Sequence, residues 1–223
     1  MFKLTKLITL DPKASAADRQ CLAETLRSAT RSNQYVLRSR LQLTEMGVWN
    51  GGDLIWHVQL TDEAAYRAWV RQSSWHETER ALADAPVFHV DSVAYEQGSI
   101  GVAEPEISNG VHRTLLLAIR PAVAGEKIAQ FEAEMREMAR YIPAIRNWGF
   151  SRVLEAGGAR QWSHVWEQEF RDLSGLQGPY MMHPIHFARI DRWFDTETTD
   201  WIVDTAICHT FCVFDDSMLA PLR

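Results

Sequence analysis

The sequence has little cysteine and no long apolar run, and both absences restrict its class. Its 223 residues include three cysteines, an odd and small number that gives no disulfide framework. No run of about 18 apolar residues occurs, and no charged leader precedes an apolar segment, so neither a membrane span nor a signal peptide is expected. We therefore expect a cytoplasmic protein.

Positive charge is also scarce and scattered. Lysine and arginine total 23 against 29 acidic residues, which gives a net charge of -6, so neither nucleic acid nor an anionic membrane is an expected partner. The sequence contains no glycine-rich phosphate loop, no serine nucleophile elbow and no HExxH helix. Nucleotide-binding, serine-hydrolase and zinc-protease functions are therefore disfavoured.

One cysteine pattern has the spacing of a metal site. Cys208 and His209 are followed by Cys212 within an apolar, strand-like run. Alternation along a strand places the two cysteines on one face and His209 on the other. Small buried thiols are the better interpretation, and we expect no metal and no cofactor.

The hydrophobic content, 46%, suffices for one large core or two small ones. Hydrophobic periodicity predicts the order β-α-β-β-α-β twice, with a polar, glycine-containing linker between. We therefore predict two domains, residues 1–98 and 110–223. The predicted strands are 1–9, 35–43, 54–60, 87–96, 111–120, 145–154, 161–170 and 201–214, and the predicted helices are 15–29, 63–83, 125–140 and 184–193.

The two halves also share a local pattern. Each third strand follows a Gly-Gly pair and carries tryptophan and histidine before a valine, as Trp56-His57-Val58 and as Trp162-Ser163-His164-Val165. A duplicated domain is the simplest explanation. The split β-α-β-β-α-β order is that of a ferredoxin-like sheet with both helices on one face.

One face of the predicted strand 161–170 is strongly aromatic. A single sheet with helices on one side would expose this face to water, whereas two sheets packed face to face would bury it. We therefore predict an α+β fold in which two ferredoxin-like repeats pack sheet to sheet as an intrachain α+β barrel; further pairing of two chains as a homodimer stays open. The face consists of Trp162, His164, Trp166, Gln168 and Phe170.

The segment 178–187 concentrates chemistry-bearing residues. Pro184 is tolerated only in the first turn of a helix, which predicts a helix start there with His183 at the cap. His186 then lies near the positive end of the helix dipole, which disfavours its protonated form. A neutral histidine can accept a proton, and Tyr180 lies close along the chain. The alternative is that both histidines only cap the helix.

These residues carry a family resemblance. His164, Phe170 and the run from Tyr180 through His183 to His186 resemble the stress-responsive α/β-barrel (Dabb) family of the dimeric α+β barrel superfamily. In plant polyketide cyclases of this family the matching tyrosine and last histidine are implicated in catalysis. The resemblance implies that Tyr180 and His186 are catalytic, with His164 and His183 lining or supporting them. The loop before Tyr180 is one residue longer here.

The first half lacks the motif. Its nearest aromatic residue is Trp69, and neither the tyrosine nor the His-Pro pair is present. We expect His57 and His76 to be structural. The second half is therefore expected to hold the larger cavity, lined by tryptophan, methionine and histidine.

Three functions are compatible with these residues. The leading hypothesis is a cofactor-independent acid/base enzyme, of lyase, decarboxylase, cyclase or isomerase type, acting on an aromatic or polyketide-like small molecule. His186 would be the base and Tyr180 the partner of the developing oxyanion. The alternatives are a haem-related or cofactor-less monooxygenase, with His164 or His186 as the haem ligand, and a non-catalytic stress-responsive binding protein. The expected substrate-binding residues are His164, His183, Trp162, Trp166, Trp193 and Met182.

Overall fold

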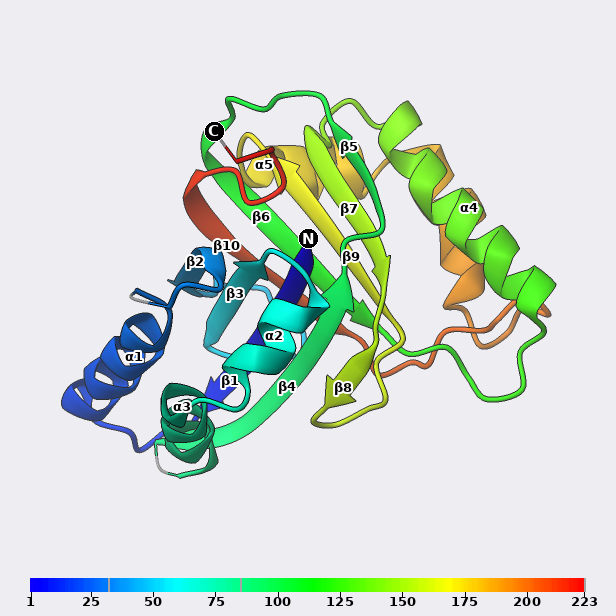
Figure 1. The fold of residues 1–223 in the computed structure, drawn as a ribbon. Helices are drawn as coiled ribbons and strands as arrows, with labels where there is room; N and C mark the ends of the chain where they lie inside the picture. Colours follow the sequence, from blue (N-terminus) through cyan, green and yellow to red (C-terminus); the bar gives the residue numbers. More distant parts are fainter. Residues whose placement is uncertain (32, 85, 223) are drawn as a thin grey trace.

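The computed structural model describes residues 1–31, 33–84 and 86–222. It contains two five-stranded antiparallel sheets, with helices on the outer face of each (Figure 1). The predicted α+β fold with two ferredoxin-like sheets is confirmed. Within these residues, no helix combines the length and the apolar character needed to cross a membrane.

The first half follows the predicted order. Asp62 caps α2, its carboxylate accepting the backbone N–H of Ala65 at 2.8 Å. The single helix predicted over 63–83 is two helices, because the chain turns after Trp69 without a glycine or proline to signal the break. The sheet order is β2-β3-β1-β4-β8. The elements are β1 (Phe2–Leu10), α1 (Ala16–Arg31), β2 (Val36–Leu43), β3 (Leu54–Leu60), α2 (Glu63–Trp69), α3 (Ser73–Ala83) and β4 (Val87–Glu96).

The second half repeats this order, and a series of short helices replaces its second helix. The sheet order is β10-β6-β9-β7-β5. The strands are β5 (Ser99–Val102), β6 (Ser108–Leu117), β7 (Asn147–Arg152), β8 (Glu155–Gly157), β9 (His164–Phe170) and β10 (Cys208–Asp216). The helices are α4 (Gly125–Tyr141), α5 (Leu173–Gly175), η1 (Leu176–Tyr180), η2 (Ile185–Ile190) and η3 (Asp191–Trp193).

Two short edge strands connect the sheets. The segment predicted to be a linker contains β5, which pairs with β7 in the second sheet. Conversely β8, from the second half, pairs with β4 in the first sheet. The linker sequence has no periodicity, but backbone N–H and C=O groups form these ladders whatever the polarity of the side chains. The first sheet therefore ends in a strand from the second half, and the second sheet ends in a strand from the predicted linker.

The turn after β8 requires glycine. Gly158 has φ +103°, and a Cβ there would contact the Asp91 carboxylate and the Val90 carbonyl oxygen. We expect Gly158→Ala to lower the free energy of unfolding by about 1–3 kcal/mol, measured by urea denaturation. The matched control is Gly125→Ala, at the start of α4, where a Cβ meets no atom within 4 Å; a loss of equal size there would contradict the assignment to backbone strain.

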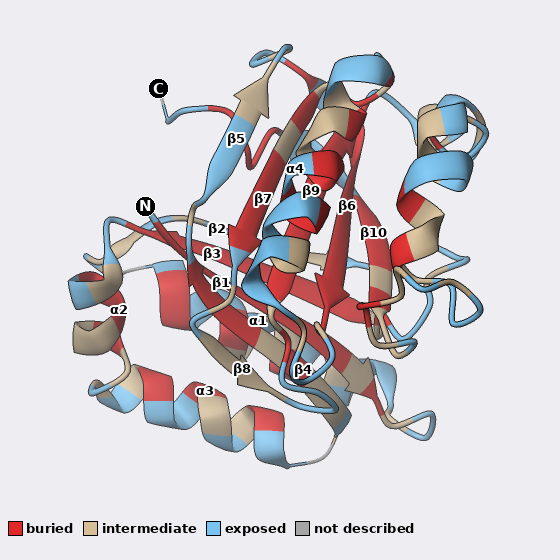
Figure 2. Ribbon diagram, turned by 90° about the vertical axis from the view of Figure 1, so that its right-hand side faces the viewer, coloured by how far each residue is buried: buried red, intermediate tan, exposed pale blue. Residues whose placement is uncertain are grey.

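The inner faces of the two sheets pack against each other. Leu7 and Tyr95 of the first sheet belong to one buried cluster with Leu116 of the second. The ammonium of Lys3 also pairs across the sheets with the Glu167 carboxylate, at 2.9 Å. Figure 2 shows these strands buried at the centre of the molecule. The predicted sheet-to-sheet packing within one chain is confirmed.

The aromatic face of β9 points away from the other sheet, contrary to our argument. Trp166 and Phe170 pack in the layer beneath the helices, with Phe131 of α4. The face toward the other sheet carries Glu167 and Glu169 instead, and both are buried. Alternation along the sequence assigns residues to the two faces of a strand. It does not show which face packs against the helices and which against the other sheet when the polar face has buried partners.

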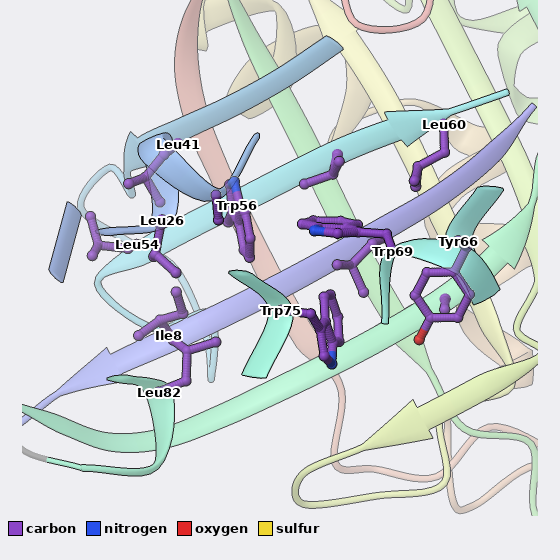
Figure 3. Packing of buried hydrophobic residues seen from close by; sticks show 14 of the residues in the cluster. Ile8, Leu26, Leu41, Leu54, Trp56, Leu60, Tyr66, Trp69, Trp75 and Leu82 are labelled. Carbon is purple, nitrogen blue, oxygen red and sulfur yellow. The ribbon is translucent and has the colours of Figure 1, made fainter. Parts of the chain in front are cut away.

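The ladders also correct the alignment of the repeats. Phe2 pairs with Leu60 in the first half as Val111 pairs with Phe170 in the second. Trp56 is therefore equivalent to Trp166, and His57 is equivalent to Glu167 rather than to His164. Figure 3 shows the tryptophans that fill the helix-facing layer of the first half: Trp56, Trp69 and Trp75.

Candidate functional site

A cavity of about 230 Å³ lies between the second sheet and its helices. It brings together the two residues singled out by the sequence, Tyr180 and His186, with side chains from four other elements, β6, α4, η3 and β10. A larger hollow of about 680 Å³ lies between α1 and α3 of the first half, so the expectation that the second half has the larger cavity is wrong. The second-half cavity is lined chiefly by Arg113, Met135, Met138, Tyr180, His186 and His209.

The local geometry around Pro184 orients the pair. Pro184 precedes η2, and the His183 ring nitrogen Nδ1 accepts the backbone N–H of Ile185 at 3.2 Å. Both η1 and η2 have wide turns of the π type, which are rare and concentrate at functional sites. The rings of Tyr180 and His186 meet edge to face with centroids 4.8 Å apart. The predicted helix start and proximity are both observed.

His186 is held in its neutral form. Burial lowers the pKa of its imidazole; the Asp191 carboxylate opposes this effect, and the Arg113 guanidinium adds to it. The Nδ1 atom lies 3.5 Å from Asp191 Oδ1 and has no hydrogen-bond partner among the described residues. With a pKa below 6.5, the ring is unprotonated at pH 7 and can accept a proton.

Arg113 places a buried positive charge in the cavity wall. Its Nε–H donates to His209 Nε2 at 2.7 Å and its Nη1–H to Gln168 Oε1 at 2.6 Å. The guanidinium carbon lies 5.1 Å from the centroid of the Tyr180 ring. Across the described part of the chain, no ion pair within 4.0 Å involves Arg113. A buried charge without a counter-charge is costly, so the cavity favours an anion.

His209 is the neutral support of Arg113. Burial, Arg113 and His186 together lower its pKa to about 3. The unfolded chain thus binds a proton that the folded chain excludes, so stability falls as pH drops below about 6.5.

We expect His209→Gln, whose amide oxygen still accepts the Arg113 N–H, to reduce this acid sensitivity. Between pH 7 and 5, wild type should lose about 1–2 kcal/mol more of its unfolding free energy than the variant, measured by urea denaturation. His76→Gln, at an exposed position, should behave as wild type. Parallel losses in wild type and His209→Gln would contradict the assignment.

Two of the expected substrate-binding residues lie elsewhere in the fold. His164 bonds to Glu132 through Nε2 at 3.0 Å and to Ser163 through Nδ1 at 2.8 Å. Trp162 lies between the sheets, where its indole N–H donates to Asp91 at 3.0 Å. Neither side chain lines the cavity of Tyr180 and His186.

The other expected residues border the site without lining it. Trp166 and Trp193 are buried in the helix layer, and the indole N–H of Trp193 donates to Glu134 at 2.9 Å. His183 caps η2. Met182 is 73% exposed, whereas its neighbour Met181 lines the cavity.

Sequence reasoning missed Arg113 and His209. Alternation in the Cys208–Cys212 run did send His209 to the face opposite the cysteines, and both cysteines are buried and free. The face that carries His209 forms part of the cavity wall. Arg113 and His209 are diagonal neighbours, since Arg113 pairs with Phe211 and Leu115 with His209. Only this register of β6 against β10, which cannot be deduced from the sequence, brings the two side chains together.

Known structures share this architecture. An anthrone oxidase-like protein superposes with a TM-score of 0.70 at 9% identity, covering 96% of this chain and 90% of its own. A provisionally named monooxygenase from Lactobacillus acidophilus gives 0.55 at 12% identity, covering 97% and 93%. A provisionally named chlorite dismutase gives 0.56 at 13%, covering 96% and 95%. These likenesses, all below 25% identity, show the fold alone.

A family model matches the sequence of the second half. Residues 111–205 match the family model described as Stress responsive A/B Barrel Domain, or Dabb. The predicted resemblance of the second half to this family is therefore confirmed. A search of curated proteins found no significant match.

Proposed function

We propose that the protein is a cofactor-independent acid/base enzyme acting on a small aromatic or polyketide-like molecule. The observation that carries the proposal is the joint presence, in one cavity, of a neutral His186, the Tyr180 side chain and the unpaired Arg113 cation. Proton abstraction next to a carbonyl, or from a phenol, requires a base and a separate positive charge in a site that is partly shielded from water.

His186 acts as the general base. It takes a proton from an acidic C–H or O–H of the substrate; for a C–H group, the bonding electrons move onto the neighbouring carbonyl oxygen. The protonated imidazole, beside Asp191, then returns the proton to another atom of the substrate or leaving group. Because burial lowers the pKa of His186, the rate should fall as pH drops below about 6.5 through that lowered value.

Tyr180 and Arg113 stabilise the developing oxyanion. A phenolic O–H donates a hydrogen bond to the oxygen, and the adjacent guanidinium supplies the positive charge that the negative oxygen requires. The hydrogen bonds to His209 and Gln168 fix the guanidinium before the substrate arrives. Charge that is oriented in advance has no reorganisation cost during the reaction.

The dimensions of the cavity favour a small substrate. Its volume of about 230 Å³ is below the roughly 300–1,000 Å³ typical of drug-sized ligands. Met135, Met138 and Phe194 supply apolar surface against which a ring can pack. A single-ring aromatic ketone or phenol fits both properties.

A cofactor-less monooxygenase is the second candidate. The anthrone oxidase-like structure shares the fold over nearly the whole chain, and the same base would generate a carbanion able to reduce dioxygen. A haem-dependent form fits the residues less well. Both ring nitrogens of His164 already have partners, and the cavity beside His186 is smaller than those of drug-sized ligands, let alone a porphyrin. Oxygen uptake measured with an electrode separates the two remaining reactions.

The experiment that tests this proposal first measures the binding of a small aromatic ligand. We expect a hydroxyacetophenone, an enolisable aromatic ketone, to bind in ligand-observed NMR and to be displaced when the cavity is narrowed by Met138→Trp. Tyr180→Phe should retain binding and lower any turnover by about 10²–10³-fold, the effect of one oxyanion donor. Binding with unchanged turnover in Tyr180→Phe would contradict its role. Binding without turnover by wild type, across related phenols and ketones, would favour the non-catalytic binding protein.

A further inference from the structure

We propose a second site, between the two sheets, that binds a divalent transition-metal ion through His57, His112 and Glu167. These side chains come from β3, β6 and β9, so one belongs to the first half and two to the second. One potential ligand atom from each lies within 4.8 Å of the others, and all three residues are at most 3% exposed. This site shares no residue with the cavity of Tyr180 and His186, and it does not depend on the function proposed there.

His112 supplies the second observation. Its ring is fully buried, yet neither Nδ1 nor Nε2 has a hydrogen-bond partner among the described residues. The nearest acceptors are Glu167 Oε1, 3.6 Å from Nε2, and Glu169 Oε1, 3.4 Å from Nδ1. Buried polar atoms are nearly always satisfied, and each exception calls for an explanation such as an absent ion. A metal ion bound by Nε2 provides one.

Two of the three ligands, His57 and Glu167, have outer support of the kind that metal sites use. His57 Nδ1 lies 3.0 Å from the Thr5 hydroxyl, and Nε2, which has a long contact of 3.4 Å with Thr114 Oγ1, is the atom available to a metal ion. Glu167 bonds to the Lys3 ammonium through Oε2 at 2.9 Å, which leaves Oε1. Metal-binding histidines commonly bond to a hydroxyl, carbonyl or carboxylate through their second nitrogen. For His112, the Glu169 carboxylate is the group nearest that position, with Oε1 3.4 Å from Nδ1 but no hydrogen bond.

The donor set indicates the class of ion. Two imidazoles and one carboxylate suit Zn²⁺, Fe²⁺ or Co²⁺ and not Mg²⁺ or Ca²⁺, which prefer oxygen ligands. With metal–ligand bonds of about 2.0–2.2 Å, the ligand atoms would lie about 3–4 Å apart, so side-chain shifts of less than about 1 Å close the site. The bound ion would cross-link the first sheet to the second.

The competing occupant of this space is a proton. An imidazolium at His112 would pair with Glu167 and Glu169, and together with Lys3 it would balance the buried charges without a metal ion. The experiment must therefore separate a metal-binding cluster from a purely ionic one.

Full-length protein, freed of metal with a chelator, is titrated with Co²⁺ and with Zn²⁺. We expect one equivalent of Co²⁺ to bind with visible d–d absorption of low-coordinate cobalt. Zn²⁺ at 100 times its dissociation constant should raise the melting temperature by about 5–10 °C. Absence of uptake of both ions, with a protonated His112 in nitrogen-15 NMR, would overturn the proposal in favour of the ionic cluster.

Variants locate the binding. His57→Gln and Glu167→Gln should each weaken Co²⁺ binding by at least about 100-fold, beyond the usual effect of losing an outer partner. Thr5→Val, which removes only the support of His57, should weaken it by about 10-fold and serves if a ligand variant does not fold. The matched control is His164→Gln, another buried strand histidine bonded to a glutamate, which should bind as wild type. Equal stoichiometry and affinity in all four variants would overturn the assignment.

Discussion

Replacing His186 with glutamine should lower turnover by about 10²–10⁴-fold, which is the usual contribution of a general base. Glutamine has a similar reach but cannot accept a proton at neutral pH. Folding should survive, because His186 lies at the cavity mouth and its side chain is 14% exposed. We expect a loss of at most about 1–2 kcal/mol in unfolding free energy, measured by urea denaturation beside the steady-state rate.

The matched control is His183→Gln. His183 lies three residues away on the same segment, but its ring caps η2 outside the cavity lining. Its replacement should therefore change stability slightly and turnover by less than about tenfold, since it removes no proton acceptor from the cavity. Equal rate losses in the two variants would show that the segment is needed for its fold and not for the base at His186.

Replacing Lys3 with methionine should lower the free energy of unfolding by about 3–5 kcal/mol, the cost of leaving a buried carboxylate unpaired. Methionine keeps most of the volume and apolar contact of the lysine chain, so the loss reports the charge. Lys3 and Glu167 are both about 3% exposed and come from different sheets. The measurement is urea denaturation of the metal-free protein.

Lys6→Met serves as the control on the same strand. Lys6 pairs with Glu79, whose side chain is 43% exposed, so water can solvate the carboxylate once the lysine is gone. We expect a loss of about 0–1 kcal/mol. If Lys3→Met lowered the free energy of unfolding as little as Lys6→Met, the buried pair of Lys3 and Glu167 would not hold the two sheets together.

The outline of the fold could be predicted because its signals are local. Strands β3 and β4 have the predicted bounds, since each is a continuous apolar or alternating run between turn residues. The break between α2 and α3 was missed because no glycine or proline stands at Val70–Gln72. Strand β5 was missed because its partner β7 is about 45 residues away, and pairing with a distant strand leaves no periodic trace in a four-residue segment.

The faces of the two sheets that pack against each other show a second limit of prediction from the sequence. His57 and Glu167 lie at equivalent positions of the two repeats and face the opposite sheet. An aromatic side is not expected to face water, and for that reason the aromatic side of β9 was predicted to face the other sheet. Which side is buried there depends on partners such as Lys3, more than 100 residues away.

Some residues of the candidate site could likewise be predicted from the sequence, and others could not. Tyr180 and His186 are six residues apart, at the end of η1 and in η2, so a short local segment brings them together and sequence could find them. Arg113 and His209 meet through the pairing of β6 with β10. Met182 was expected in the site and is exposed, because the direction of a side chain depends on the turns of η1 and η2 that precede and follow it.

The most direct test of the central claim is deuterium exchange. A hydroxyacetophenone bound by the wild-type protein in D₂O should exchange its methyl protons well above the rate in buffer, because His186 removes a proton and Tyr180 with Arg113 stabilises the enolate. NMR follows the loss of the methyl signal while reporting binding. The account predicts exchange in wild type and its loss in His186→Gln with the ligand still bound. Equal exchange rates in both proteins, with both saturated, would contradict it.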